Sequence, residues 1–252
     1  MTQAIERPGA DAPVVKGHKN PSGEKGKPWP IEFFSTAVGK KWVMALSGIG
    51  LMGFVFAHMV GNLKMYLGAT AYNEYAESLR TLLHPIMPDG SVLWIMRIGL
   101  IAMFAIHIGV AISLTRMNQL SRPTKYQSQR AYIAADFASR SMRWTGTLVA
   151  LYLLYHLADL TTGWANPDFV SGDAYGNVVA SLSRLPVAIL YIAANLALGI
   201  HLFHGAWSIF QSLGVNSPTY NGVRRSFAIV FAAIITIGNV SFPLAVQFGI
   251  VS

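Results

Sequence analysis

Histidines are the residues of this sequence with the clearest potential for metal chemistry, because the chain contains no cysteine. The lack of thiols excludes disulfides, thiolate zinc sites and any iron–sulfur cluster bound wholly by this chain. Two of the seven histidines, His18 and His84, fall in polar stretches. In the other five, the side chain falls in a strongly apolar segment, where an ionisable group is costly and indicates function; these are His58, His107, His156, His201 and His204.

The apolar segments around these histidines are long enough to cross a membrane as helices. A helix needs about 20 residues to span the hydrocarbon core. The composition agrees, with 53% hydrophobic and 12% charged residues, roughly half the charged share of a globular domain. The sequence therefore predicts an all-α integral membrane bundle of five transmembrane helices, over residues 42–67, 93–114, 144–163, 185–213 and 227–250.

The charged residues predict the domain limits and the orientation. Residues 1–28 are rich in Gly, Pro, Lys and Glu without apolar periodicity, and they are expected to form a flexible cytoplasmic tail before an anchor domain at 29–252. Of the 19 Lys and Arg residues, 15 fall on the side of the N-terminus and four on the opposite side. The positive-inside rule then predicts a cytoplasmic N-terminus and an external C-terminus. This asymmetry explains the net charge of +8 through topology in a lipid membrane, without a nucleic-acid partner.

Depth along the predicted helices groups the histidines into pairs. With a rise of about 1.5 Å per residue, His58 and His156 lie roughly 20–24 Å from the inner ends of the first and third spans. His107, His201 and His204 lie roughly 13–18 Å from the inner ends of the second and fourth spans. We therefore expect an outer pair on spans one and three and an inner pair on spans two and four. Each pair comes from two helices, as axial ligation of a cofactor in a bundle core requires.

Three interpretations of these pairs follow from the residues. One or two haems b, each bound by two histidines, would satisfy the pairing. A Rieske-type [2Fe–2S] cluster also uses two histidines, but its remaining ligands would have to come from a partner chain. In the third interpretation the histidines are structural, bonding neighbouring helices inside a polytopic transporter or channel.

Several motifs give the sequence a resemblance to a known family. From about Ser35 to the C-terminus it resembles the single-chain, five-span cytochrome b membrane anchor of succinate:quinone oxidoreductases, which are the succinate dehydrogenases and fumarate reductases of respiratory complex II. The resemblance is carried by STAVGKK at Ser35–Lys41, FAHMVGN around His58, AYNEYAESL from Ala71, IHIGV around His107, YHLADL around His156, and HLFHGAWSIFQSLG from His201.

The resemblance implies a function and a set of ligands. His58, His107, His156 and His201 would bind haem, with His204 as an alternative ligand on the fourth span. A flavoprotein that oxidises succinate and an iron–sulfur subunit would bind the cytoplasmic face. This chain, in a bacterial cytoplasmic membrane, would pass electrons to a quinone, expected to be menaquinone, and would hold no dicarboxylate-binding catalytic site.

The quinone site is the least determined part of this expectation. A quinone needs hydrogen-bonding or acid–base groups near the membrane interface. On the outer side the candidates are His84, Arg97 and Asp159, and on the inner side they are Lys41, Trp144 and Trp207. Some family members carry an acidic residue in the haem-bearing spans, and Asp159 is the one candidate for it here.

Overall fold

A computed structural model gives the fold of the chain. It describes residues 28–121, 133–215 and 217–252, and all of their side chains except those of residues 133–140. The predicted tail, including His18, therefore lies outside the described residues apart from Pro28.

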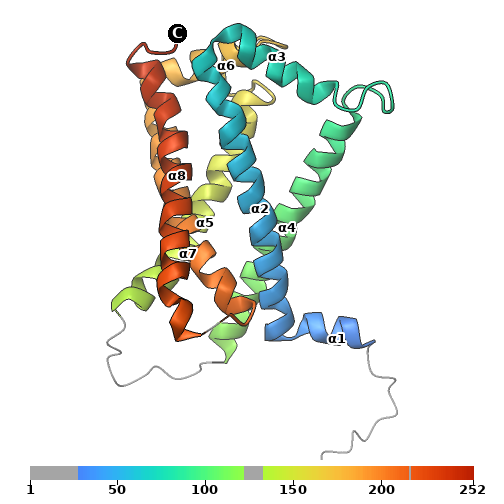
Figure 1. Cartoon of the computed structure of the whole chain (residues 1–252), viewed down its shortest axis with the longest axis vertical. Helices are drawn as coiled ribbons and strands as arrows, with labels where there is room; N and C mark the ends of the chain where they lie inside the picture. Colours follow the sequence, from blue (N-terminus) through green and yellow to red (C-terminus); the bar gives the residue numbers. More distant parts are fainter. Residues whose placement is uncertain (1–27, 122–132, 216) are drawn as a thin grey trace, which may run out of the picture.

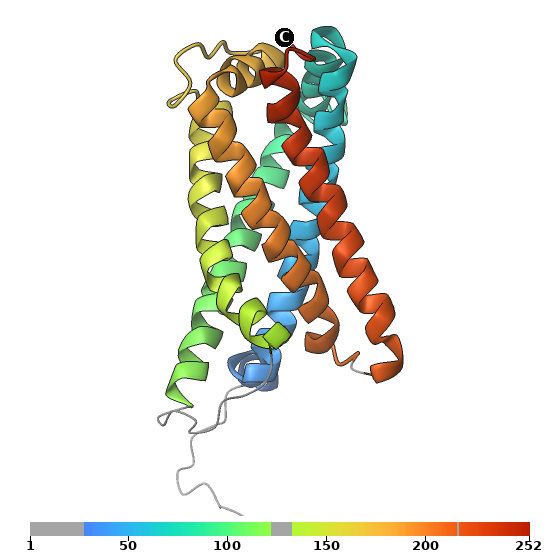
Figure 2. The same ribbon diagram turned by 90° about the vertical axis from the view of Figure 1, so that its left-hand side faces the viewer.

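Five long helices run along the molecule and form an elongated bundle (Figures 1 and 2). They are α2 (Ala37–Asn62), α4 (Ser91–Leu120), α5 (Ile133–Leu160), α7 (Leu185–Ser212) and α8 (Asn221–Gln247). Shorter elements join or flank them: α1 (Trp29–Ser35), η1 (Leu63–Leu67), α3 (Ala69–Arg80), α6 (Ala174–Ser183) and η2 (Pro218–Tyr220). No strand occurs in the described part of the chain, so the all-α fold is confirmed for those residues.

Four helical segments are long and apolar enough to cross a membrane; they are Ala37–Leu67, Ser91–Leu120, Leu185–Ser212 and Pro218–Gln247. Helix α5 has 28 residues, but polar side chains such as His156 and Asp159 lower its hydropathy. An integral membrane bundle is thus supported with four candidate spans among the described residues, and the predicted third span, 144–163, is not among the candidates.

The helices extend further toward the α1 end of the bundle than predicted. Helix α4 continues past the expected end at residue 114 to Leu120, and α5 begins at Ile133 rather than at residue 144. No glycine or proline lies between Gly109 and Pro123, so nothing in the sequence stops α4 at the membrane surface. The polar connection predicted between these spans is correspondingly shorter, and its central residues 122–132 lie outside the described ones.

The motif STAVGKK forms the corner between α1 and α2. The Thr36 side chain accepts a hydrogen bond from the backbone N–H of Gly39 at 3.0 Å and so caps the N-terminus of α2. A Cβ atom at Gly39 would collide with the carbonyl oxygen of Phe33. Glycine is therefore required here for the close approach of the two helices.

Small residues hold the long helices together. Helices α7 and α8 pack most extensively; there Ala206 and Ala228 are completely buried, and Gly199 faces the Thr236 side chain. Helix α2 packs on α4 and α7, and α5 packs on α7. Close packing of this kind is typical of membrane helices, whose association gains little from the hydrophobic effect.

The end of the bundle that carries the C-terminus is covered by α3 and α6 (Figure 1). Asn73 of α3 donates from Nδ2 to Asp173 at 3.0 Å and accepts from the backbone N–H of Tyr175 at 2.9 Å. Asp173 also accepts from the N–H of Gly176 at 2.9 Å, which caps α6. These bonds stabilise the charged carboxylate and hold the pKa of Asp173 below its usual value.

Because this pKa is lower in the folded than in the unfolded chain, Asp173 stabilises the fold above its unfolded pKa. The contribution disappears as the pH falls through the folded pKa. We expect Asp173→Ala to lose about 1 kcal/mol at neutral pH, the usual effect of removing an N-cap, and the difference from the parent protein to shrink below about pH 4. Thermal unfolding in detergent across this pH range measures it. Asp173→Asn keeps a capping oxygen and should lose less, so an equal loss in both variants would contradict the capping role.

Candidate functional site

The structure brings four of the predicted histidines together as two pairs. The rings of His58 on α2 and His156 on α5 lie 6.0 Å apart between centroids, at an interplanar angle of 84°. The rings of His107 on α4 and His201 on α7 lie 6.5 Å apart at 71°. The pairs are those expected from depth along the helices, and we keep the names outer pair for His58/His156 and inner pair for His107/His201.

Each pair joins helices that lack extensive contacts with one another. Within the described residues, α2 and α5 do not pack closely along their length, and neither do α4 and α7. The imidazoles therefore meet across space that separates the helices. Along α2, eleven residues separate Ser47, which contacts the inner pair, from His58 in the outer pair. At about 1.5 Å per residue the two levels are about 16 Å apart.

Hydroxyl groups face Nδ1 in three of the four rings. Ser47 Oγ lies 3.0 Å from His107, Thr145 Oγ1 lies 3.4 Å from His201, and the Tyr191 hydroxyl lies 3.4 Å from His156. A hydroxyl has a single proton to donate. Ser47 donates it to the carbonyl of Val43, Thr145 to that of Ser141, and Tyr191 to Asp159.

It follows that each hydroxyl can only accept a hydrogen bond from its imidazole. Nδ1 then carries the proton, and Nε2 keeps a free lone pair, which is the form that binds a metal. His58 is held differently, because its ring stacks on Phe54 with centroids 5.4 Å apart.

The ring positions fit a metal ion held between two imidazoles. With metal–nitrogen bonds of about 2 Å, as in zinc–imidazole sites, the ring centroids would lie about 6 Å apart, close to the observed separations. His58 remains exposed although its ring contacts those of Phe54 and His156, so the ring borders space that this chain does not fill. Among the described residues no group of three or more His, Cys, Asp or Glu could hold a metal. A metal at either level would therefore take two ligands from this part of the chain.

Glycines leave room beside the inner pair. A methyl group on Gly146 would lie 3.2 Å from Cε1 of His201, and one on Gly48 would lie 3.6 Å from Cε1 of His107. His204 takes no part in this arrangement. It is 9% exposed and its ring contacts that of Phe203 at 5.0 Å, so it is not brought to His107.

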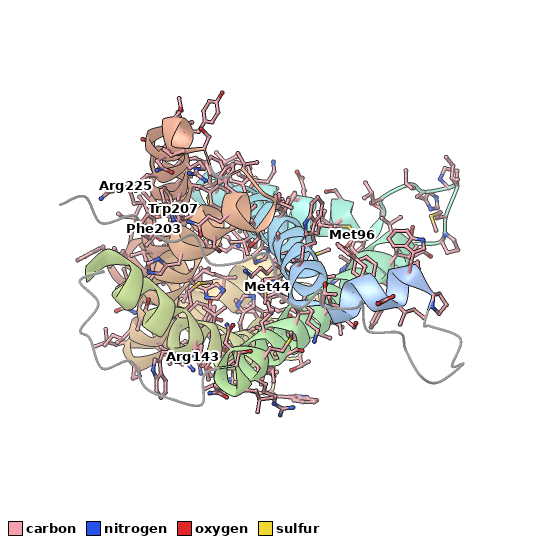
Figure 3. All side chains as sticks on the ribbon, turned by 90° about the horizontal axis from the view of Figure 1, so that it is seen from below. Met44, Met96, Arg143, Phe203, Trp207 and Arg225 are labelled. Carbon is pink, nitrogen blue, oxygen red and sulfur yellow. The ribbon has the colours of Figure 1, made fainter. Side chains whose placement is uncertain are left out.

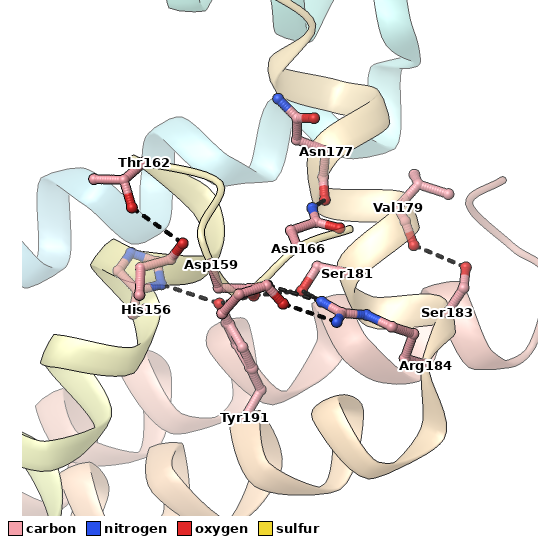
Figure 4. Close-up of polar contacts among 12 residues, drawn as sticks. His156, Asp159, Thr162, Asn166, Asn177, Val179, Ser181, Ser183, Arg184 and Tyr191 are labelled. Atoms are coloured by element: carbon pink, nitrogen blue, oxygen red, sulfur yellow. Dashed lines mark hydrogen bonds and ion pairs between the residues drawn. The ribbon is translucent and has the colours of Figure 1, made fainter. Parts of the chain in front are cut away.

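A network of buried polar groups lies behind the outer pair (Figure 4). The Asp159 side chain is 0% exposed. It accepts hydrogen bonds from Ser181 Oγ, from the Tyr191 hydroxyl at 2.7 Å and from Arg184 Nη2 at 2.8 Å. Arg184 also donates from Nη1 to the carbonyl of Ala165 at 2.9 Å. The sequence predicts only Asp159 among these groups, because none of its partners follows from a motif or a local spacing.

The three outer quinone candidates do not lie together in the structure. Arg97 stacks over the Trp94 ring at 5.1 Å and lines a hollow of about 300 Å³ that Glu77, Arg80 and Asp89 also border. His84 is exposed beside this hollow and pairs with Asp89 at 3.1 Å. Asp159 lies elsewhere, and its oxygens are occupied by the network.

The inner quinone candidates lie on three different helices. Lys41 is exposed near the start of α2, Trp144 on α5 is 73% exposed, and Trp207 on α7 stacks with Arg224 at 5.5 Å. Figure 3 shows this end of the bundle from below, with Trp207 and Arg225 near one edge and Met44 and Arg143 nearer the middle. No cluster of these three candidates forms.

These features define a helical membrane protein with two histidine pairs suited to metal binding. The comparison with protein families places it further: residues 122–240 match the model for the succinate dehydrogenase/fumarate reductase transmembrane subunit. The matched part makes up almost half of the chain, and the match supports the resemblance to a cytochrome b membrane anchor. Neither the curated proteins nor the solved structures give a match.

The matched family is the membrane subunit of an oxidoreductase complex, and the family implies association with a flavoprotein and an iron–sulfur subunit. A cytochrome b type subunit is consistent with haem and quinone. The match includes His156 and His201 and excludes His58 and His107, which are connected to it through the ring pairs.

The Asp159–Arg184 pair gives a test of the network. Arg184→Met leaves a buried carboxylate without its cation, and for a buried pair this costs about 3–5 kcal/mol; we expect the lower end, since Arg184 is 30% exposed. The double variant Asp159→Leu/Arg184→Met should lose less stability than the single variants Asp159→Leu and Arg184→Met lose together. Thermal unfolding in detergent measures the stability of all three variants.

Arg80→Met is the matched control for this test. Arg80 pairs with Glu77 at 3.7 Å on the surface, where such pairs contribute about 0–1 kcal/mol. Equal losses for Arg80→Met and Arg184→Met, or strictly additive losses in the double variant, would contradict the buried pair.

Proposed function

We propose that this chain is the membrane anchor and electron-transfer subunit of a succinate dehydrogenase, which passes electrons from the iron–sulfur subunit to a membrane quinone, expected to be menaquinone. The observation that carries the proposal is the meeting of two histidine pairs across helices that lack extensive packing with one another. The family match supports the assembly with the two other subunits.

Haem b is the cofactor that these residues fit best. His58 and His156 would hold one group and His107 and His201 the other, through Nε2. A low-spin haem with two imidazole ligands supplies one-electron transfer. The chain's part is to fix the tautomer of three imidazoles through Ser47, Thr145 and Tyr191, and to keep the rings opposed. A Rieske-type cluster stays the alternative at one level, with its thiolates supplied by a partner.

We further propose that α5 is the fifth span. It runs beside α7 (Figure 2). It also carries His156, whose ring contacts that of His58 on α2, and this contact supports a span at the same depth as α2. Five crossings would separate α1 from the C-terminus, which lie at opposite ends of the bundle (Figure 1). The α1 end would be cytoplasmic, because most of the basic residues belong to it.

The cytoplasmic partners would dock on the α1 end. Trp29, Ile31 and Phe34 of α1 are exposed there, and the basic residues Lys40 and Lys41 follow in the first turn of α2. Aromatic anchors with a basic rim are typical of protein interfaces. The opposite end would offer its hollow at Arg97 and Trp94 to the quinone, with His84 beside it; Lys41, Trp144 and Trp207 are the inner alternative.

Single histidine substitutions test the proposed function. His58→Ala and His156→Ala should each remove one redox centre from the reduced-minus-oxidised absorption spectrum, and His107→Ala and His201→Ala should remove the other. Quinone reduction should fall to background in the inner-pair variants while succinate oxidation with a soluble acceptor continues. His204→Ala should keep both centres; if it loses the inner centre and His201→Ala does not, the ligand on α7 is wrongly assigned.

Reporter fusions test the proposed orientation. A reporter that is active only outside the cytoplasm should be active after Ser252 and inactive when placed before Trp29, since 15 of the 19 basic residues would lie inside. Fusion in the α3–α4 connection should behave like the C-terminal fusion. A C-terminal reporter active only in the cytoplasm would refute the orientation, and cytoplasmic reporters at both Trp29 and Ser252 would refute the odd number of spans.

A further inference from the structure

We propose that Tyr191 and Asp159 act as positioning residues behind His156 and set the redox potential of the outer centre separately from that of the inner centre. The inference rests on the proposed function, because it concerns a redox centre at the outer pair. Tyr191 and Asp159 lie outside the two histidine pairs, and their contact with His156 would make the reduction potentials of the outer and inner centres differ.

Tyr191 lies in contact with both His156 and Asp159. Tyr191 on α7 is 5% exposed, and its ring contacts the ring of His156 with centroids 6.0 Å apart. Its hydroxyl lies 3.4 Å from His156 Nδ1 and 2.7 Å from Asp159 Oδ2. The phenol therefore stands between the carboxylate and the imidazole (Figure 4).

The Asp159 carboxylate fixes the direction of both hydrogen bonds of Tyr191. Asp159 is paired with Arg184 at 2.8 Å, so its carboxylate is ionised and can only accept. Tyr191 must donate to it, and the phenol oxygen is then left to accept from Nδ1–H of His156. The ionised carboxylate polarises the phenol, which becomes a stronger acceptor.

The inner pair differs in the acceptors of its two hydroxyl groups. There the hydroxyls of Ser47 and Thr145 donate to backbone carbonyls, at 2.8 Å in both cases. Those acceptors are neutral, whereas the acceptor behind Tyr191 carries a charge. Of the three hydroxyl-bonded imidazoles, His156 is thus the one with a carboxylate behind it.

The hydrogen bond at Nδ1 of His156 would affect a metal bound at Nε2. A hydrogen bond from Nδ1–H to a strong acceptor raises the basicity of the imidazole. A more basic ligand stabilises the oxidised metal, with its higher charge, more than the reduced metal. The Asp159–Tyr191 relay should therefore lower the reduction potential of the outer centre and leave the inner centre unchanged.

Tyr191→Phe removes the hydroxyl and keeps the ring. Substitution of a residue that hydrogen-bonds a metal ligand commonly changes metal affinity or activity 10–100-fold. We expect the oxidised-to-reduced ratio of the outer centre at a fixed poise to fall about tenfold, an upward shift of about 59 mV for one electron. A redox titration of the assembled complex, followed by absorption and EPR spectra, measures it. The inner centre should not move.

Two variants serve as matched controls. Tyr155→Phe removes the hydroxyl of a neighbouring tyrosine, whose ring lies 6.2 Å from that of Tyr191, and it should shift neither centre. Ser47→Ala removes the hydroxyl facing His107 and should raise the potential of the inner centre alone. Opposite selectivity in Tyr191→Phe and Ser47→Ala supports the inference.

Ser181→Ala keeps the test decisive if Tyr191→Phe does not assemble. It removes one donor to Asp159, so the carboxylate accepts more strongly from Tyr191. The reduction potential of the outer centre should then fall, and the oxidised-to-reduced ratio at a fixed poise should rise by less than tenfold. An unchanged potential in Tyr191→Phe, an equal shift at both levels, a shift in Tyr155→Phe, or a rise in Ser181→Ala would overturn the inference. The proposed function fails separately, if substitution of His58 or His156 leaves both redox centres in the spectrum.

Discussion

Every polar side chain between the long helices needs a partner inside the protein, because no water is available in the hydrocarbon region to replace it. This requirement accounts for the positions of the helices as much as their apolar surfaces do. Ser47 on α2 and Thr145 on α5 each bond a carbonyl of their own helix and face a histidine of another. Each hydroxyl thus donates its hydrogen bond within its own helix and also orients an imidazole of another helix. This contact fixes the rotation of the two helices relative to each other.

The same requirement explains the end of the bundle that carries the C-terminus. Asp159 is near the C-terminal end of α5, Ser181 is on α6, and Arg184 precedes α7. One carboxylate therefore connects three elements, and the Ala165 carbonyl brings in the loop between α5 and α6. Removal of the aspartate would leave the hydroxyls of Ser181 and Tyr191 without this acceptor, and Arg184 would keep its bond to the Ala165 carbonyl but lose its ion pair. The polar groups here specify how the helices end, and the helices in turn fix the depth of His156.

The sequence predicts those parts of the site that depend on helical periodicity. Depth along a helix follows from residue number, so the partners of His58 and His107 could be predicted from residue spacing alone. The face of a helix can also be predicted: Ser47 and His58 are eleven residues, or about three turns, apart on one side of α2. Because Ser47 lies at the depth of the inner pair, its hydroxyl contacts His107 rather than His58. The partners of Asp159 could not be predicted, since Arg184 is 25 residues further along and approaches through a turn that has no periodicity. Helices α1 and α6 could not be predicted from long apolar segments because both helices are short.

Helix α4 buries no side chain in this chain alone, although it carries His107. Its main neighbour is α2, and it meets α7 at the imidazole contact of the inner pair. If a prosthetic group occupies the inner pair, its insertion completes the packing of this helix. Supply of the group would then control the lifetime of the newly made subunit: a chain inserted into the membrane ahead of its cofactor would present a loosely held helix to membrane proteases, and the cell would accumulate anchor only as fast as it provides the cofactor.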